Sequence, residues 1–253
     1  MTLQFISGMD SGLSSFRKYL LRAQATISGQ NYLTVANYYD GCTYSTKSVI
    51  YKWNNGKFNK FQENPTEGAA GCTAFVINND TFIAFSSNYH SKQKYAVQST
   101  VFKWSGGQFV KLQSFQTYGA YGVTSVNINA DTFLAFGNRY SGSRSNIDSF
   151  IYKWNGTMFV LFQSIPSRGA IAWHSFVISG QTFLGVANYY GDLQKYNTHS
   201  VVYQDCGAQF IKYQEIPTHG ARDMITFEYK GHTYLAVANY YNQKHNSRQI
   251  RNQ

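Results

Sequence analysis

The sequence predicts an all-β fold, a β-propeller built from four-stranded antiparallel blades. Two recurring strings carry this prediction, one of the type FLGVANYY and one of the type VIYKWNNGKF, and they alternate along the chain. Copies of the first string begin at Tyr32, Phe82, Phe133, Phe183 and Tyr234, in steps of 50, 51, 50 and 51 residues. We therefore expect about five repeats of ~50 residues over residues 22–253, preceded by an N-terminal segment at 1–21.

Each repeat holds four predicted strands. Strands of the first kind resemble HSFVIS (174–179), and a short polar turn joins them to strands of the second kind, such as TFLGVAN (182–188). Strands of the third and fourth kinds, FIYKWN (150–155) and MFVLFQSI (158–165), are joined by NG or GG turns, which favour tight hairpins. The second strands are apolar on both faces, which is typical of a sheet held between two neighbouring sheets.

The ends of the repeat region leave two ring sizes open. After the last YLAVANYY only residues 242–253 follow, and SRQIRNQ (247–253) is a poor candidate for a further third strand. TLQFIS (2–7) could supply a fourth strand that closes the ring against the last blade, although it lies too early for the spacing of the repeats. Both a closed five-bladed ring and part of a larger ring fit the sequence.

Composition narrows the classes of partner. The chain carries a net charge of +10, but its Lys and Arg residues are scattered, which argues against nucleic acid as a partner. No apolar run approaches the ~18 residues of a membrane helix, so we expect no membrane insertion. The start MTLQFISGMDSG has neither the basic nor the apolar region of a secretory signal.

Three motifs recur in a constant order: VIYKWNNGKF (49–58), YQEIPTHGA (213–221) and YLAVANYY (234–241) are clear copies of them. Together they resemble the EAR, or epitempin (EPTP), repeat. That repeat occurs in leucine-rich glioma-inactivated proteins and in an EAR-repeat protein with a thrombospondin-type laminin G domain. The resemblance covers residues 22–241, nearly the whole chain.

The resemblance implies a propeller, an extracellular or cell-surface location, and a protein-binding or adhesion role without catalysis. The chain departs from the family pattern in three ways. Family propellers usually have seven repeats, whereas five are visible here, so part of a seven-bladed ring is one of the two ring sizes. Gln204 and Asp205 replace the Lys-Trp of the other third strands, and the signal peptide expected of the family is missing.

Aromatic residues follow every copy of the second strand. Because strand direction alternates, the loops after the second strands and the connections after the fourth strands open on one face, here named the loop face. The two sets of hairpins open on the other, the hairpin face. We expect the loop face to bind a partner through residues that combine Tyr with Arg and His, a composition typical of binding surfaces. These residues are Tyr38, Tyr39, Tyr89, His90, Arg139, Tyr140, Tyr189, Tyr190, Tyr240 and Tyr241.

Two other recurring residue types favour structural roles. An asparagine ends each second strand, where its side chain would bond nearby backbone and set the loop direction. These asparagines are Asn37, Asn88, Asn138, Asn188 and Asn239. The tryptophans of the third strands, Trp53, Trp104 and Trp154, are expected to fill the space between blades.

The predicted topology also assigns the cysteines and the glycosylation sequons to one of the two faces. Cys42 in a loop and Cys72 in the next connection would share the loop face, so they form the one candidate disulfide, and Cys206 in a hairpin is left over. Sequons at Asn79 and Asn155 lie in hairpin turns, which would leave the loop face free of glycans.

The sequence shows little sign of catalytic residues or of a metal or cofactor site. None of the twelve acidic residues recurs at one position in every blade, the six histidines lack metal-ligand spacing, and no phosphate loop or nucleophile elbow occurs. We therefore expect no enzyme activity, metal or cofactor. The leading hypothesis is a protein-binding module. The alternative is a lectin-like propeller that binds carbohydrate, but the loops after NYY differ in every repeat, which favours one composite protein site.

Overall fold

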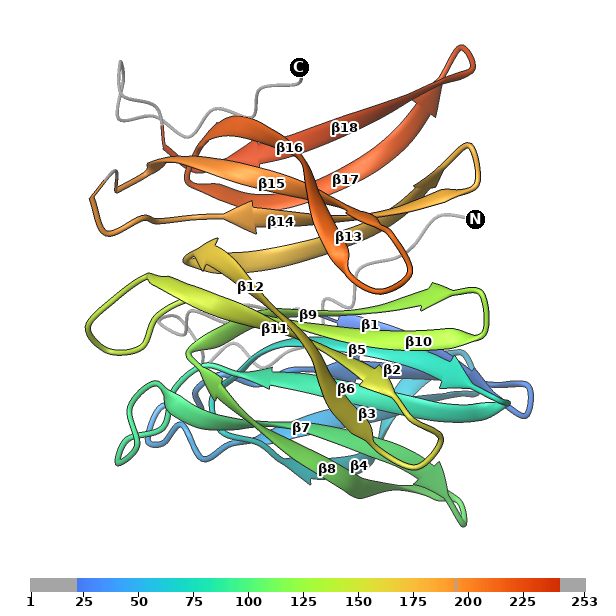
Figure 1. The fold of residues 1–253 in the computed structure, drawn as a ribbon. Coiled ribbons are helices and arrows are strands. Elements are labelled where there is room, and N and C mark those ends of the chain that lie inside the picture. The colour runs from blue at the N-terminus through green and yellow to red at the C-terminus, as the bar shows by residue number, and fades with distance from the viewer. Residues whose placement is uncertain (1–21, 194, 242–253) are drawn as a thin grey trace.

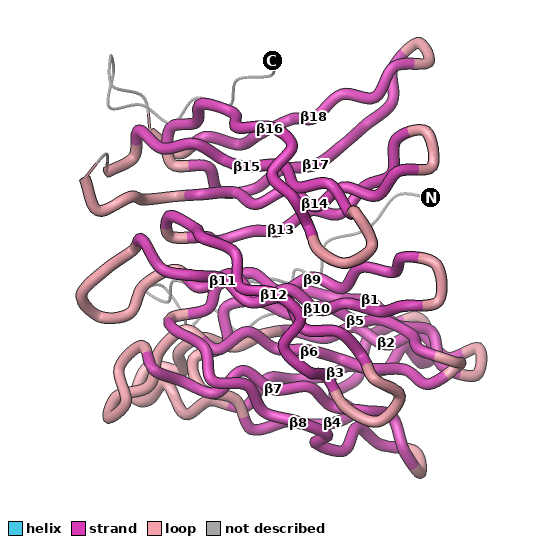
Figure 2. The backbone as a smooth tube through the Cα atoms, in the orientation of Figure 1, coloured by secondary structure: helices cyan, strands magenta, loops and turns pink. Residues whose placement is uncertain are grey.

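The structure is a computed structural model that describes residues 22–193 and 195–241. All regular elements in these residues are β-strands (Figure 2), and they include no helix that could span a membrane. The sequence expectations for TLQFIS (2–7) and SRQIRNQ (247–253) lie outside the described residues.

The strands form four four-stranded antiparallel sheets and one two-stranded sheet, as the repeats predict. Blade 1 contains β1 (Arg22–Ile27), β2 (Gln30–Val35), β3 (Lys47–Asn54) and β4 (Lys57–Pro65). Blade 2 contains β5 (Ala69–Ile77), β6 (Asp80–Ser87), β7 (Ala96–Ser105) and β8 (Gln108–Tyr118). Blade 3 contains β9 (Ala120–Ile128), β10 (Asp131–Asn138), β11 (Asn146–Trp154) and β12 (Phe159–Arg168). Blade 4 contains β13 (Ala170–Ile178), β14 (Gln181–Asn188), β15 (Asn197–Asp205) and β16 (Phe210–His219). Blade 5 contains β17 (Ala221–Tyr229) and β18 (His232–Asn239).

The blades follow one another in chain order (Figure 1). Their first strands pack side by side in the order β1, β5, β9, β13 and β17. Within the described residues this succession does not return from β17 to β1 with comparable packing. The five repeats therefore form an arc of propeller blades around a common axis.

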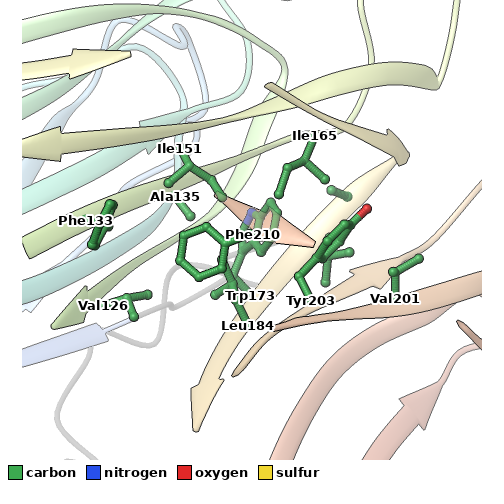
Figure 3. Packing of buried hydrophobic residues seen from close by; sticks show 12 residues of the cluster. Val126, Phe133, Ala135, Ile151, Ile165, Trp173, Leu184, Val201, Tyr203 and Phe210 are labelled. Carbon is green, nitrogen blue, oxygen red and sulfur yellow. The ribbon is translucent and has the colours of Figure 1, made fainter. Parts of the chain in front are cut away.

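The second strands supply the buried layer of each blade. In β6, β10 and β14 nearly every residue is buried, which confirms that these strands are covered on both faces. Figure 3 shows the cluster between blades 3 and 4, where Phe133 and Ile151 meet Trp173, Leu184 and Phe210. Because each cluster joins two sheets, a blade buries its apolar surface only against its neighbours.

The third-strand tryptophans fill the space between blades where a preceding blade exists. Trp104 packs against Tyr32 and Trp154 against Phe82, with ring centroids 5.4 and 5.5 Å apart. Trp53 departs from the expectation, since it is 42% exposed. It lies in blade 1, where no described blade precedes it.

Glutamines of the fourth strands clamp adjacent blades together. The Gln113 side chain donates to the carbonyl of Phe159 at 2.8 Å and accepts from its N–H at 2.9 Å. Gln62 and Gln163 make the same pair of bonds to Phe109 and Phe210. The glutamine of the recurring FQ motif thus links each blade to the next by two hydrogen bonds.

The two faces of the arc differ as predicted. The loops after β6, β10 and β14 lie at one end of the sheets, and the hairpins β9–β10, β13–β14 and β17–β18 lie at the other (Figure 1). The hairpin turns between first and second strands begin with a residue of φ between 48° and 54°, which matches the twist of tight hairpins. This alternation places every NYY-type loop on the loop face.

Candidate functional site

A network of buried hydrogen bonds recurs beneath the loop face, where the second, third and fourth strands of a blade meet the loops. A serine near the start of each third strand accepts a hydrogen bond from the last backbone N–H of the second strand, as Ser149 does from Asn138 at 3.0 Å. The same serine pairs with a hydroxyl of the fourth strand, for example Ser99 with Thr117 at 2.8 Å. These serines, Ser48, Ser99, Ser149 and Ser200, are fully buried. Buried hydrogen bonds therefore hold the strand ends from which the loops begin.

The glycine that follows each fourth strand ties the connection to the loop. The N–H of Gly119 donates to the carbonyl of Tyr95 at 2.6 Å, and the Gly119 carbonyl accepts from Arg139 at 3.4 Å. Gly119 has φ +53, and a Cβ there would lie 2.7 Å from the carbonyl oxygen of Tyr140. Only glycine tolerates both the backbone conformation and this approach.

The strand-ending asparagines bond the backbone. The Asn188 side chain donates to the carbonyl of His199 at 2.8 Å and accepts from the N–H of Arg168 at 3.0 Å. The equivalent bonds recur in full at Asn138 and in part at Asn37 and Asn239.

Asn88 departs from this pattern. Ser87, not Asn88, pairs with the first residue of β5, because FIAFSSN is one residue longer than FLGVAN. Asn88 consequently lies one position further along, where its side chain donates to the Gly119 carbonyl at 2.7 Å. Asn88 thus does not end its strand, contrary to the sequence prediction. In the other blades the two residues after the strand-ending asparagine form a pair: Tyr38 and Tyr39, Arg139 and Tyr140, Tyr189 and Tyr190, Tyr240 and Tyr241. In blade 2 the equivalent pair is Asn88 and Tyr89, and not Tyr89 and His90.

The second residue of each pair contributes to an aromatic row on the loop face. Tyr39, Tyr89 and Tyr140 belong to blades 1, 2 and 3, and Tyr190 and Tyr241 belong to blades 4 and 5. The hydroxyls of Tyr39 and Tyr140 bond loop carbonyls two residues ahead, at Gly41 and Gly142. These rings are partly exposed, so the row faces solvent.

Three tyrosines that the sequence reasoning missed complete the row. Tyr44 lies 4.6 Å from both Tyr39 and Tyr89, and Tyr95 lies 5.1 Å from Tyr89 and 4.8 Å from Tyr140, between ring centroids. Tyr196 similarly contacts Tyr190 and Tyr241. Each precedes the buried serine of its third strand by four residues, a spacing that could have revealed them.

The row is interrupted in blade 3. Ser145 occupies the position of these loop tyrosines, and the carboxylate of Asp192 from blade 4 accepts from the N–H groups of Ser145 and Asn146, at 2.6 and 3.3 Å. The aromatic row is thus divided into a part on blades 1–3 and a part on blades 4–5.

The first residues of the pairs turn toward the axis. The hydroxyl of Tyr38 donates to the side-chain oxygen of Asn88 in the next blade at 3.4 Å. Burial, followed by the nearby Tyr44, raises the pKa of Tyr38 above its usual value.

Two arginines lie over tyrosine rings of the loop face. The guanidinium carbon of Arg139 lies 5.4 Å from the ring centre of Tyr189, and that of Arg222 lies 5.1 Å from the same ring. Arg139 also lies over Tyr121, and Arg222 lies 4.5 Å from the ring centre of Tyr240. These distances are those of cation–π contacts.

Tyr121 and Arg222 were not expected from the sequence, because they follow the fourth strands rather than the NYY strings. Arg222 is the extra residue of a β-bulge, since Ala221 pairs with Asn239 and Asp223 with Ala238. A bulge re-aims its side chain, and no repeat signal marks which residue it will present.

The loop of blade 2 places three polar residues, His90, Lys92 and Lys94, beside the aromatic row. His90 and Lys94 exchange backbone hydrogen bonds, and the His90 ring accepts from the N–H of Lys92 at 3.2 Å. The Lys94 ammonium donates to the Tyr89 hydroxyl at 3.4 Å and lies 5.8 Å from its ring centre. Lys92 and Lys94 are exposed beside the aromatic row.

The predicted Cys42–Cys72 disulfide is not formed. Cys42 is exposed in the loop of blade 1, but Cys72 lies inside β5, where it pairs with Phe85 and packs between blades 1 and 2. The prediction failed because β5 begins at Ala69, so Cys72 belongs to a strand and not to the connection. Cys206 is exposed in a hairpin, as expected.

The sequon asparagines are both exposed on the hairpin face. Asn79 lies in the β5–β6 turn, and Asn155 lies in the β11–β12 turn. The Asn155 side chain accepts from the N–H groups of Thr157 and Met158, at 3.0 Å each. Among the residues that the structure describes, no group of His, Cys, Asp and Glu is gathered to hold a metal ion.

Comparison with known proteins places the chain in a family. A family model described as the EPTP domain matches residues 57–105, 108–155, 158–204 and 209–248. The thrombospondin-type laminin G domain and EAR repeat-containing protein of Mus musculus is 37% identical over 227 residues, which is 85% of this chain and 34% of that protein. The Homo sapiens protein of that name is 34% identical over 101 residues, 39% of this chain and 15% of that protein. The chain thus spans a third or less of the length of these relatives.

Solved structures support the fold alone. YjhT superposes with a TM-score of 0.55 at 14% identity, over 85% of this chain and 76% of that chain. An α-L-arabinofuranosidase from Fusarium graminearum gives a TM-score of 0.55 at 10% identity, over 79% and 66%. Because the EPTP model matches most of the chain and its motifs recur blade after blade, this chain belongs to the EPTP (EAR) repeat family.

Proposed function

We propose that this chain is a non-catalytic protein-binding and adhesion module that acts outside the cell or at its surface and engages its partner through the loop face. The observation that carries the proposal is the aromatic row. Its rings recur in all five blades, while the polar residues between them differ from blade to blade. Rigid aromatic anchors among variable polar groups suit one composite protein site.

The acidic residues of the loop face have structural partners. Asp40 accepts from the N–H groups of Cys42 and Thr43, and Asp192 accepts from Ser145 and Asn146. Their carboxylates hold loop backbone, which supports a binding role over acid–base catalysis. The extracellular location is supported by the laminin G domain in the name of the relatives.

The proposal is tested with a panel of secreted and cell-surface ectodomains and, in parallel, a glycan array. Wild-type protein is compared with Tyr89→Ala and Tyr190→Ala on the aromatic row. Tyr229→Ala, an exposed tyrosine at the hairpin end of β17, is the matched control. We expect an ectodomain that binds wild type and the control but binds both row variants at least tenfold more weakly.

Two results would contradict the proposal. Selective glycan binding without an ectodomain partner would favour the lectin-like alternative. Loss of the folded state in both row variants, seen as a collapse of the thermal transition, would make the tyrosines packing residues.

A further inference from the structure

The junction between blades 4 and 5, where β13 packs beside β17, is joined through a histidine side chain. The first strands β1, β5, β9 and β17 contain no histidine, whereas β13 carries His174. The backbone N–H of Thr226 donates to Nε2 of His174 at 3.0 Å, and the Thr226 hydroxyl lies 2.9 Å from the same nitrogen. Because a backbone N–H can only donate, Nε2 is unprotonated and the neutral ring carries its proton on Nδ1.

These bonds lie where the apolar packing of the junction ends. On the side toward the loop face, the two blades share a buried cluster that contains Ala187, Ala221 and Met224. Toward the hairpin face, a cleft of about 330 Å³ opens between the two first strands, and the residues that line it include Phe176, Phe227 and Glu228. Phe227 is 49% exposed, whereas the equivalent Phe75 of blade 2 is 6% exposed. The bonds of His174 therefore join the two blades at the edge of an open space.

The surroundings of His174 favour its neutral form. Burial lowers the pKa of His174, and the carboxylate of Asp223 partly offsets this shift. Since the pKa is lowered, the contribution of His174 to stability is fully present above the unfolded value of about 6.5 and is lost as pH falls below it. The titratable residues of the strands packed against β13, and of β18 beside them, are Tyr121 on β9, Asp131 on β10, Arg222, Asp223, Glu228 and Tyr229 on β17, and His232 and Tyr234 on β18.

We propose that His174 is an acid-sensitive contact between blades 4 and 5, and that its protonation releases the hairpin ends of the two blades from each other. A protonated Nε2 carries an N–H of its own, which faces the N–H of Thr226 and leaves that donor without an acceptor. The apolar cluster on the loop side does not titrate, so blade 5 stays attached there while the cleft widens. The inference goes beyond the proposed function and does not depend on it.

The test measures hydrogen–deuterium exchange of the intact chain by mass spectrometry at about pH 7.5 and about pH 5, with rates corrected for the intrinsic effect of pH. In wild type we expect the amides of residues 225–229 in β17 to exchange at least about fivefold faster at the lower pH, while those of β9 and β10 in blade 3 do not change. His174→Gln keeps an acceptor on a side chain that does not titrate, so it should show no such acid response. His232→Gln removes an exposed histidine of the β17–β18 hairpin, is the matched control and should respond as wild type.

Three results would overturn the proposal. Equal corrected exchange of β17 at both pH values in wild type would show that the contact does not respond to acid. The same acid response in His174→Gln would assign the response to another group. Faster exchange in every blade would show general acid unfolding instead of a local opening.

Asp223→Asn provides a second measurement that leaves His174 in place. Because the Asp223 carboxylate raises the pKa of His174, its removal should shift the acid response of β17 to lower pH. A response that stays at the same pH in this variant would contradict the assignment to His174.

Discussion

The loop face and the hairpin face are built from the same strands, yet they use the repeat differently. On the hairpin face, the turns between first and second strands repeat one backbone conformation at their first residue, and a lysine–aspartate pair occurs in blades 2 and 3, as Lys103–Asp80 and Lys153–Asp131. On the loop face the asparagine, glycine and tyrosine positions recur, while the residues between them change. Repetition thus supplies the architecture of both faces, and the longer connections, whose residues differ between blades, lie on the loop face.

The largest difference is expected from glycines at the two ends of β8. Gly119→Ala on the loop face should lower the free energy of unfolding by about 3 kcal/mol, because its Cβ would meet the Tyr140 carbonyl at 2.7 Å in a backbone of φ +53. Gly107→Ala on the hairpin face has φ +87 but open space around its Cβ, so it should cost about 1 kcal/mol. Urea unfolding of the two variants measures the difference, and equal losses would show that the loop face is no more constrained than the turns.

Two asparagines make a second matched pair. Asn188→Ala should cost about 2 kcal/mol, because it leaves the Arg168 N–H and the His199 carbonyl without their partner in a buried position. Asn155→Ala removes bonds of an exposed turn and should cost about 0.5 kcal/mol. Thermal unfolding measures the loss of stability in each variant. A larger loss in Asn155→Ala than in Asn188→Ala would show that the turn asparagine stabilises the fold more than the strand-ending one.

The axis side of the loop face predicts an alkaline response. The pKa of Tyr38 is raised in the folded state, so its contribution to stability is fully present below pH ~10 and is lost as pH rises beyond the unfolded value. Tyr38→Phe should therefore move the midpoint of alkaline unfolding to higher pH. Circular dichroism as a function of pH measures this midpoint. An unchanged midpoint would show that the pKa of Tyr38 is the same in the folded and the unfolded state.

The smallest effect is expected on the hairpin face. Lys103→Ala breaks an ion pair of 2.7 Å whose lysine and aspartate side chains are 36% and 49% exposed, so it should change stability by less than about 1 kcal/mol. Binding of the partner should not change. A loss of binding in this variant, measured against wild type, would extend the functional surface to the hairpin face.

The repeats could be predicted from the sequence because strand spacing, hairpin turns and both-face burial are local signals. Tyr39, Tyr140 and Tyr190 were found on the loop face by the alternation of strand direction alone. Tyr44, Tyr95 and Tyr196 were missed because their position depends on loop closure onto the glycine of the next connection. Arg222 was missed because a bulge, which leaves no repeat signature, places it over the rings of Tyr189 and Tyr240.

Misplaced strand ends explain the two corrections. Cys72 was assigned to a connection, but β5 already begins at Ala69 and carries the cysteine into the space between blades. The extra residue of FIAFSSN moved Asn88 to the first position of its pair. A single-residue shift matters at these positions because successive side chains of a strand point to opposite faces.

A glycan placed on one face or the other tests the central claim most directly. Ser141→Asn creates a sequon with Ser143 in the loop of blade 3, and its side chain can keep the turn bonds of Ser141 to the N–H groups of Ser143 and Arg144. Protein secreted from mammalian cells behind an added leader would then carry a loop-face glycan, whereas the natural sequon at Asn155 places one on the hairpin face. We expect Ser141→Asn to abolish ectodomain binding, and the added change Ser143→Ala, which destroys the sequon, to restore it. Undiminished binding by the loop-face glycoprotein would show that the partner does not bind the loop face.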